Sequence, residues 1–152
     1  KWPNDVLVGN RKLAGILLEL SGDPADVCHV VIGIGLNVNM LSVDSGVIGQ
    51  PWTSMRAELG RLLNRNELVS ELNRQLSRYL DIQLSGGFAA LQDVWQACHL
   101  WQGKSVALTA GGEPIEGEVL GVDHSGAIRL RINELERSFS GGELSLRLRD
   151  DS

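Results

Sequence analysis

Two apolar segments separated by a compact turn place the strongest constraint on how this chain folds. Residues 13–20 read LAGILLEL, and residues 27–38 read VCHVVIGIGLNV, which is rich in β-branched residues. Between them, residues 21–26 read SGDPAD, a composition that favours a turn. The pattern predicts a β-hairpin, and the second run predicts a strand that is buried on both faces. Gly33 and Gly35 interrupt that second strand.

Helical signals follow the hairpin. Residues 39–50 show no period and are expected to form a loop, whereas residues 51–63 predict a helix that starts near Trp52. Asn64 and Glu67 have the spacing of a helix start, and leucines recur every four residues after them until Gly86 and Gly87 end the segment. Residues 88–98 predict a shorter helix whose inward side includes Val94 and Cys98.

The character of the chain changes at Gly103. Short alternating segments follow, divided by turn-forming stretches such as GGE, DHSG and SGG. Five short strands with tight turns predict a small β-barrel. We therefore expect one domain over residues 1–102 and a second, all-β domain over residues 103–152.

Composition narrows the class of protein. The chain has 152 residues and a net charge of −5, which argues against a nucleic-acid-binding domain. Cys28 and Cys98 fit buried free thiols better than a disulfide, and the three histidines lack metal-ligand spacing. No apolar run has membrane-spanning length and no signal peptide is present, so we expect a cytoplasmic protein. The start without Met leads us to expect a piece of a longer protein.

A group of polar residues lies close to the first strand. Lys1, Asn4, Asp5, Arg11 and Lys12 precede it, and Gly15 follows just beyond. Cations suit phosphate or carboxylate groups, amides and carboxylates suit hydroxyl and amino groups, and glycine gives access, so the mixture indicates a site for an anionic ligand.

Each of these residues also has an ordinary structural interpretation. Lys12 alone reads as a turn residue whose ammonium points to water. Gly33 and Gly35 relieve crowding in a central strand, since the sequence after them does not complete a dinucleotide-binding motif. Trp52 alone reads as a packing residue of a helix.

Several stretches in order resemble the biotin protein ligase family. They are KWPND at residues 1–5, RKLAGIL at 11–17, VIGIGLNVN at 31–39, the loop that ends at Trp52, and GGELSLR at 141–147. The resemblance implies an α/β (α+β) mixed-sheet core like that of class II aminoacyl-tRNA synthetases, followed by a small Src-homology-three-like barrel. It also implies an enzyme that makes biotinyl-5'-AMP from biotin and MgATP and transfers biotin to a lysine of the biotin carboxyl carrier domain of acetyl-CoA carboxylase.

The resemblance also implies roles for individual residues. Lys12 would be the catalytic lysine, which touches the biotin carboxylate and the adenylate linkage. The biotin slot would be lined by Lys12, Gly15, Leu17, Gly33 and Gly35. The adenylate side would be served by Asn4, Asp5, Asn37, Val43, Ile48 and Trp52. Weaker candidates for a ligand contact are Lys1, Arg11, Glu143 and Arg147. No metal ligand is expected in the chain, so Mg²⁺ would arrive with ATP.

One part of the family pattern is absent. The Gly/Arg-rich adenylation loop does not occur in this sequence, so we expect the chain to be the second half of a catalytic core with its C-terminal barrel, and to be inactive alone. A homodimer is expected, and DNA binding only if the whole protein carries an N-terminal DNA-binding domain. Two alternatives stay open, namely a lipoate-protein ligase and a non-catalytic module that dimerises or binds a carrier domain.

Overall fold

The computed structural model describes residues 1–22, 28–42, 49–109, 114–140 and 145–149. By its internal contacts the chain divides into two compact units. One unit is Asn4–Leu68, and the other combines Lys1–Pro3 with Val69–Ser152. The domain boundary expected at residue 103 stays a prediction, although the strands of the second sheet begin just after it, at Ser105.

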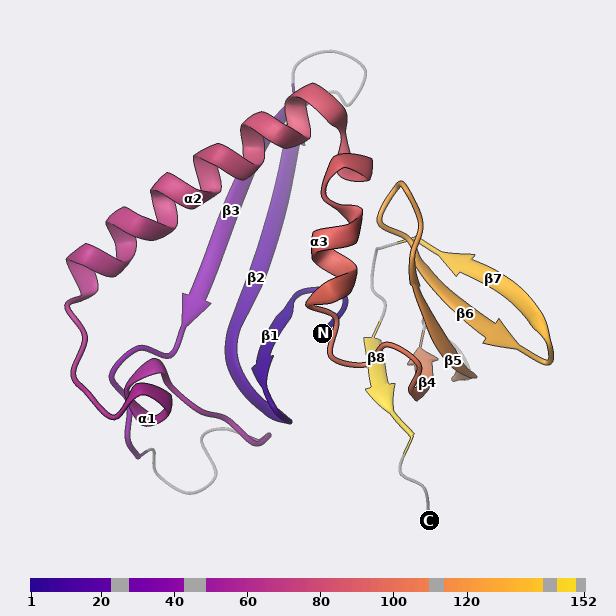
Figure 1. Cartoon of the computed structure of the whole chain (residues 1–152), viewed down its shortest axis with the longest axis horizontal. Coiled ribbons are helices and arrows are strands. Elements are labelled where there is room, and N and C mark those ends of the chain that lie inside the picture. Colours follow the sequence, from indigo (N-terminus) through magenta and orange to yellow (C-terminus); the bar gives the residue numbers. More distant parts are fainter. Residues whose placement is uncertain (23–27, 43–48, 110–113, 141–144, 150–152) are drawn as a thin grey trace. The chain divides into compact units, whose positions relative to one another are not determined.

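The first unit contains the predicted hairpin. β2 (Arg11–Gly22) pairs with β3 (Cys28–Leu36) along its length, and β1 (Asp5–Val8) pairs with the start of β2 (Figure 1). Within the described residues these strands form an antiparallel sheet in the order β1-β2-β3. Parallel pairing in the described part of this unit is limited to one bridge between Lys12 and Trp52. The turn predicted at residues 21–26 lies mostly outside the described residues.

The prediction that the second strand is buried on both faces is wrong. No residue of β3 belongs to the buried class, and Val31 and Ile34 are 60% and 40% exposed. A run of apolar residues indicates that a strand can be buried. Its side chains leave water only where a second layer of structure packs on them. The apolar face of the hairpin therefore remains accessible in the described part of this chain.

The helix predicted over residues 51–63 is much shorter. α1 spans only Met55–Leu59, because the Ser54 hydroxyl caps its start by accepting from the Ala57 amide at 3.1 Å. Gly60, in the left-handed conformation, ends it after little more than one turn. Trp52 lies before the cap, in extended backbone that bridges to β2.

The long helix matches its prediction. α2 spans Arg65–Gly86, and the Asn64 side chain both accepts from the Asn66 amide at 3.0 Å and donates to Glu67 at 3.0 Å. Gly87, with φ of 64°, follows the last residue of the helix. No residue of α2 is buried, and Leu84 at its end is 86% exposed. No helix among the described residues is long and apolar enough to cross a membrane.

The helix predicted over residues 88–98 divides into a 3₁₀ turn, η1 (Phe88–Ala90), and α3 (Gln92–Ala97). Two of the side chains expected to point inward, Val94 and Cys98, are exposed. The prediction of buried thiols is also wrong, because Cys98 is exposed and Cys28 is only half-buried. Among the described residues of this unit, nothing covers the exposed side of the short helix. The spacing of its apolar residues therefore predicted more burial than the structure has.

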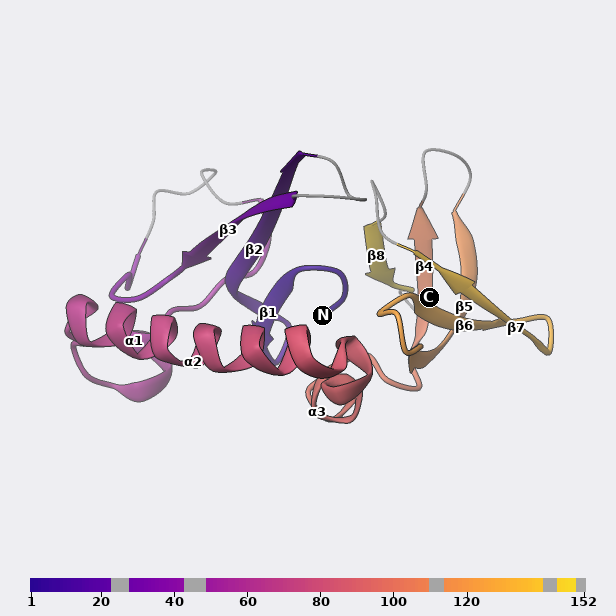
Figure 2. The same cartoon turned by 90° about the horizontal axis from the view of Figure 1, so that it is seen from above.

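All the strands predicted after Gly103 are present. They are β4 (Ser105–Thr109), β5 (Ile115–Val122), β6 (Ile128–Ile132), β7 (Leu135–Phe139) and β8 (Ser145–Leu148). They pair antiparallel in the order β7-β6-β5-β4-β8, and Figure 2 shows β6 and β7 crossing the direction of β4, as in a strongly twisted sheet. Alternating residues form the core, with Leu108, Ile128 and Leu130 fully buried. The predicted α/β architecture with an all-β C-terminal part is confirmed.

Candidate functional site

A β-bulge sets the direction of Lys12. Val6 pairs with Ala14, but the next residue, Leu7, pairs with Lys12, so β2 carries one extra residue at Leu13. In a regular strand Lys12 and Gly15 would face opposite sides, because successive side chains alternate. In the structure a Cβ placed on Gly15 would lie 3.4 Å from Cε of Lys12. The bulge therefore brings the Lys12 side chain onto the face of the hairpin that carries Gly15.

Lys12 forms an ion pair on that face. Its Nζ atom lies 2.7 Å from Oδ1 of Asp5, which comes from β1. The side chains are 30% exposed for Lys12 and 13% exposed for Asp5, so the pair is partly shielded but still open to a ligand. The carboxylate holds the ammonium in place beside the glycine face.

Glycines make this face of the hairpin shallow. Gly15 lies opposite Gly35, and Leu17 lies opposite Gly33. A Cβ at Gly33 or Gly35 would meet the hairpin only at ordinary contact distances of 3.7 Å or more. Crowding within the described hairpin therefore does not require glycine at either position, and their main effect is to leave room above the strands. The resulting open groove is lined by Asn4, Asp5, Lys12, Gly15, Ile16, Leu17, Gly33, Ile34 and Gly35.

A second hollow adjoins the groove at Lys12. It is a cavity of about 170 Å³ whose lining includes Lys12, Gly15 and Gly35, all of which also line the groove. Its other walls come from Ala14, Asn37, Gln50 and Trp52. Lys12 thus stands where two hollows meet, one with glycine and leucine walls and one with an aromatic and amide wall.

Backbone hydrogen bonds fix Trp52 beside Lys12. The Lys12 amide donates to the Pro51 carbonyl at 2.9 Å, and the Thr53 amide donates to the Lys12 carbonyl at 2.9 Å. The Asn37 side-chain amide donates to the Thr53 carbonyl at 3.0 Å and so joins the end of β3 to the same segment. The half-buried indole of Trp52 consequently lines the cavity rather than a helix face.

Arg11 takes part in a cluster that the sequence did not reveal. Its guanidinium lies 2.9 Å from the Glu58 carboxylate, which also accepts from the hydroxyl of Thr53, a residue only 2% exposed. The cluster joins the start of β2 to α1 and to the segment that carries Trp52. Arg11 therefore has a protein partner in the described structure, which weakens its case as a ligand contact.

The structure brings together most of the predicted site residues. Asn4, Asp5, Lys12, Gly15, Leu17, Gly33, Gly35, Asn37 and Trp52 all line one or both hollows. Val43, Ile48 and Glu143 lie outside the described residues. Lys1 and Arg147 both belong to the other unit. Nζ of Lys1 lies 5.4 Å from the centroid of the Trp101 ring of that same unit, and Arg147 is on β8. Their part in a ligand site stays a prediction.

Sequence reasoning missed further lining and supporting residues. The lining residues are Ala14, Ile16, Ile34 and Gln50, and the supporting residues are Thr53 and Glu58. Thr53 and Ser54 carried a usable signal, because hydroxyl residues in this position favour the start of a helix and exclude the preceding Trp52 from it. Glu58 carried no such signal, since its partners come from β2 and from the turn before α1.

Comparisons with known proteins agree with this arrangement. Residues 1–37 match the model of the biotin/lipoate A/B protein ligase family, and residues 103–147 match that of the biotin protein ligase C terminal domain. The chain belongs to the biotin protein ligase family. Both ends of the described structure thus match parts of ligase proteins, and the second match is specific to biotin protein ligases.

Relatives of this ligase family align along nearly the whole chain. The bifunctional ligase/repressor BirA of Escherichia coli is 37% identical over 97% of the chain, which covers 46% of that protein. A biotin--[acetyl-CoA-carboxylase] ligase of Paracoccus denitrificans is 34% identical over 86% of the chain and 55% of that protein. The chain therefore spans about half the length of the curated relatives it matches.

A solved ligase structure has the same fold. The biotin protein ligase from Aquifex aeolicus in complex with biotin and ATP superposes with a TM-score of 0.85 and 28% sequence identity. The match covers 97% of this chain and 61% of the Aquifex chain. The elements of this chain thus have counterparts in the structure of a ligase in complex with biotin and ATP.

Proposed function

We propose that this chain supplies part of the active site of an ATP-dependent biotin protein ligase. The observation that carries the proposal is the bulge at Leu13, which turns Lys12 onto the glycine face of the hairpin beside Asp5. A lysine on a solvated turn needs no such distortion. The matched relatives and the Aquifex structure with biotin and ATP support the same activity.

The groove suits biotin. Gly15, Gly33 and Gly35 keep the hairpin surface shallow enough for a bicyclic ligand, and Leu17 gives it an apolar side. The carboxylate at the end of the biotin side chain would lie at Lys12, where the groove meets the cavity. In this arrangement Asp5 holds the lysine and Asn4 offers polar contacts at the same end.

The cavity beyond Lys12 suits the adenylate. Trp52 supplies an aromatic wall for a flat base, and Asn37 supplies an amide. Val43 and Ile48 belong to the same proposal, although they lie outside the described residues. ATP bound there would place its α-phosphate near Lys12, between the two hollows.

The chemistry requires a cation at that meeting point. A biotin carboxylate oxygen attacks the α-phosphorus of ATP, the bond to the bridging oxygen breaks, and pyrophosphate leaves. Both reactants are negative, so the Lys12 ammonium lowers their repulsion and stabilises charge that grows in the transition state. In the second step the amine of a carrier lysine attacks the acyl carbon, and AMP leaves with the bonding electrons.

Mg²⁺ enters this proposal only with ATP. Among the residues that the structure describes, no group of three or more His, Cys, Asp or Glu side chains could hold a metal ion. The carboxylate of Asp5, which lines the groove, is paired with Lys12. When bound, Mg²⁺ would neutralise phosphate charge, as it does where substrate phosphates provide most of its ligands.

The proposed partners follow from the reaction and from the sheet. The protein substrate is a biotin carboxyl carrier domain, as the name of the Paracoccus relative suggests. We also propose a homodimer, because the pairing of β1 with β2 ends at Gly15, the Ile16 amide donates to Asn4, and the same edge of residues 17–22 has no strand partner in the described structure. DNA binding is proposed only if the full-length protein carries a separate DNA-binding domain. This chain has a net charge of −5 and thus no excess of basic residues for contacts with DNA phosphates. A cytoplasmic location belongs to the same proposal.

Biotin-dependent exchange of labelled pyrophosphate into ATP tests the function in the protein at its full natural length. We expect exchange with biotin and little with lipoate, together with a higher melting temperature when biotin is added. Exchange with lipoate instead would identify a lipoate-protein ligase. Carrier binding without any exchange would identify a non-catalytic module and refute the proposal.

A further inference from the structure

Glu58 of α1 joins two residues that adjoin the candidate site without lining it. Its carboxylate lies 2.9 Å from the Arg11 guanidinium and accepts a hydrogen bond from the Thr53 hydroxyl. Arg11 comes directly before Lys12, and Thr53 comes directly after Trp52. In the described structure neither hollow has Arg11, Thr53 or Glu58 in its lining. Glu58 therefore links the backbone segment that carries the lysine to the segment that carries the indole.

This link lies behind the wall of the cavity. Successive side chains of extended backbone point to opposite faces, so Arg11 and Lys12 of β2 face opposite ways. The same holds for Trp52 and Thr53 in the extended segment that bridges to β2. The indole lines the cavity, whereas Thr53 is only 2% exposed and turns towards Glu58. The link therefore holds the two segments together without occupying space that a ligand needs.

The backbone bridge between the same two segments is short. The Lys12 amide donates to the Pro51 carbonyl, and the Thr53 amide donates to the Lys12 carbonyl, each at 2.9 Å. The Asn37 side chain adds one bond to the Thr53 carbonyl at 3.0 Å. A bridge of so few bonds opens more readily than a strand within a ladder. The contact of Thr53 with Glu58 is thus an additional attachment at a weakly held place.

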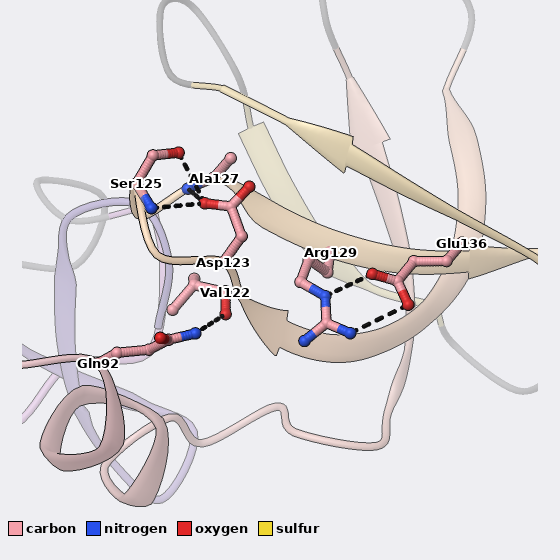
Figure 3. A network of polar contacts seen from close by, with 7 residues as sticks. All are labelled: Gln92, Val122, Asp123, Ser125, Ala127, Arg129 and Glu136. Atoms are coloured by element: carbon pink, nitrogen blue, oxygen red, sulfur yellow. Dashed lines mark hydrogen bonds and ion pairs between the residues drawn. The ribbon is translucent and has the colours of Figure 1, made fainter. Parts of the chain in front are cut away.

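Two carboxylates of the second unit make contacts of a more local kind. Figure 3 shows Asp123, which accepts from the Ser125 hydroxyl at 2.7 Å within one turn, and Glu136, which pairs with Arg129 on the neighbouring strand. Exposed pairs between neighbouring strands contribute little to stability. Glu58 differs because one of its partners is a buried hydroxyl, which would be left without an acceptor if the carboxylate were lost.

We infer that Glu58 is a positioning residue for Trp52. By holding Thr53 to the start of β2, it keeps the indole at the wall of the cavity beside Lys12 before a ligand arrives. The link is a property of the chain itself, whereas its effect on nucleotide binding rests on the proposed function. Because Trp52 lines the cavity and not the groove, the link should matter for the nucleotide and much less for biotin.

A simpler role for Glu58 would be to stabilise the start of α1. Ser54 caps this helix, and Glu58 lies in its first turn, where an acidic side chain is favoured. That role alone would protect the amides of α1 and none in β2. The contact with Arg11 favours the wider role, because the start of a helix needs no partner from a distant strand.

Hydrogen exchange measured by NMR on the protein at its full natural length separates the two roles without a catalytic assay. The informative probe is the Lys12 amide, which donates to Pro51, and the internal control is the Ile16 amide, which donates to Asn4. Thr53→Val keeps the shape of the buried side chain but deletes the hydroxyl. We expect exchange at Lys12 to become about tenfold faster, as the loss of one hydrogen bond allows, and exchange at Ile16 to stay unchanged.

Conservative variants make the result decisive. Thr53→Ser keeps the hydroxyl and should keep slow exchange at Lys12. Glu58→Gln keeps an acceptor for that hydroxyl but removes the charge opposite Arg11, so it should speed exchange less than Thr53→Val does. Unchanged exchange at Lys12 in a folded Thr53→Val protein would overturn the inference. Faster exchange confined to the Gly60 amide, which closes α1, would overturn it in favour of the simpler role.

If Thr53→Val does not fold, the wild type decides. The link and the bridge join the same two segments, so one opening event should release both ends of the bridge. The amides of Lys12 and Thr53 should then open with equilibrium constants within about a factor of ten of each other. A larger gap would show that the two bonds open independently and would overturn the inference.

Calorimetric titration tests the effect on the proposed site. The probes are biotin and the α,β-methylene analogue of ATP, which cannot release pyrophosphate. Thr53→Val should bind the analogue about tenfold more weakly, because the indole is in place in a smaller fraction of molecules, and should bind biotin within about twofold of the wild type. Arg61→Gln, which changes an exposed cation just after Gly60, is the control and should alter neither affinity. Equal losses for both ligands in Thr53→Val would overturn the positioning role.

A double-mutant cycle identifies the group through which the link acts. In a Trp52→Ala background, Thr53→Val should weaken binding of the analogue little further, because no indole remains to be positioned. Additive losses would separate Thr53 from Trp52 and overturn the inference. A full-length protein that binds neither biotin nor the analogue would refute the proposed function, while exchange at Lys12 would still decide whether the link holds the segment.

Discussion

Nζ of Lys12 lies 2.7 Å from Oδ1 of Asp5, on the face of the hairpin toward which the bulge at Leu13 turns the lysine side chain. Gly15 adjoins this pair, and a Cβ there would lie 3.4 Å from Cε and 3.5 Å from Nζ of Lys12. A side chain at residue 15 would therefore lie directly against the lysine, at ordinary van der Waals distance. Glycine at this position leaves that space beside the ammonium open.

Gly15→Ala should impair chemistry more than biotin binding. The added methyl group would lie against Cε and Nζ of Lys12 and fill space beside the ammonium, where the reacting groups must be closely positioned. We expect adenylate formation to slow about 10-fold to 100-fold in single turnover, with a smaller change in the dissociation constant for biotin. Gly33→Ala is the matched variant: its Cβ would meet Leu17 and no atom of Lys12 within 4 Å, so it should weaken biotin binding with little further effect on rate. The reverse pattern would contradict this account of Gly15.

Local rules were sufficient for much of the fold. The hairpin followed from two apolar runs around a turn, α2 followed from its Asn64 cap and terminal glycines, and the strands after Gly103 followed from alternation and turn chemistry. Each of these signals lies within a few residues of the element it specifies. The candidate site residues were found through a motif resemblance, and the structure gathers most of them around Lys12.

The remaining features depend on contacts that a single segment does not encode. The bulge at Leu13 is a property of the β1 and β2 pairing, so alternation alone would have turned Lys12 away from Gly15. Trp52 left the predicted helix because its neighbours pair with Lys12 in β2. The exposure of β3 and of Cys98 was missed because a hydrophobic pattern cannot tell whether another layer covers it.

Trp52→Ala should weaken adenylate binding more than biotin binding. The indole lines the cavity with Asn37 and Gln50 but does not line the groove, so its loss removes a stacking surface for the base alone. Loss of one aromatic stacking contact predicts a penalty of about 1–3 kcal/mol for the nucleotide. Calorimetric titration of both ligands measures the difference. Equal losses for biotin and nucleotide would indicate a packing role for Trp52.

Acid should destabilise the second unit through His99. Burial, the largest cause, lowers the pKa of His99 to about 4 from an ordinary value near 6.5. Between these values the unfolded chain binds a proton that the folded chain does not, so the free energy of unfolding falls as pH drops from about 6.5 towards 4. After allowance for partial solvation we expect a loss of about 1–2 kcal/mol.

Denaturant unfolding at several pH values tests this dependence, with His99→Gln as the comparison. Glutamine does not titrate, so the variant should lack this part of the pH slope between pH 6.5 and 4 even if it is less stable at neutral pH. Parallel slopes for the wild type and the variant would show that His99 is solvated or paired in the folded protein.

Leu18→Lys should weaken a homodimer of the protein at its full natural length. Leu18 lies in the part of β2 beyond the β1 pairing and is 53% exposed, so its side chain and edge are available to a second copy. A lysine there adds charge to both copies across a symmetric contact. Sedimentation velocity with bound ligand should show a higher monomer fraction for the variant, and Leu62→Lys, at an exposed position beyond α1, is the control. A wild-type protein that remains monomeric at high concentration would refute the proposed dimer.

Removal of the Lys12 charge should harm chemistry far more than binding. Lys12→Met keeps the length and apolar bulk of the side chain, and the backbone bonds of residue 12 to Pro51 and Thr53 do not depend on the ammonium, so the hairpin should survive. Loss of one preorganised charged donor predicts a fall of about 10²–10³ in the rate of adenylate formation. The measurement is single-turnover formation of biotinyl-adenylate at saturating biotin and MgATP, with folding checked by circular dichroism.

Lys12→Arg separates charge from geometry in the same assay. It keeps the positive charge but spreads it over a planar group that is larger than the ammonium now paired with Asp5. We expect it to recover only part of the lost rate, because the site between the two hollows is shaped for a compact charge. Full recovery would mean that charge alone matters at this position. A folded Lys12→Met protein that forms adenylate at the wild-type rate would instead show that Lys12 is a solvated residue of the hairpin, with no part in the reaction.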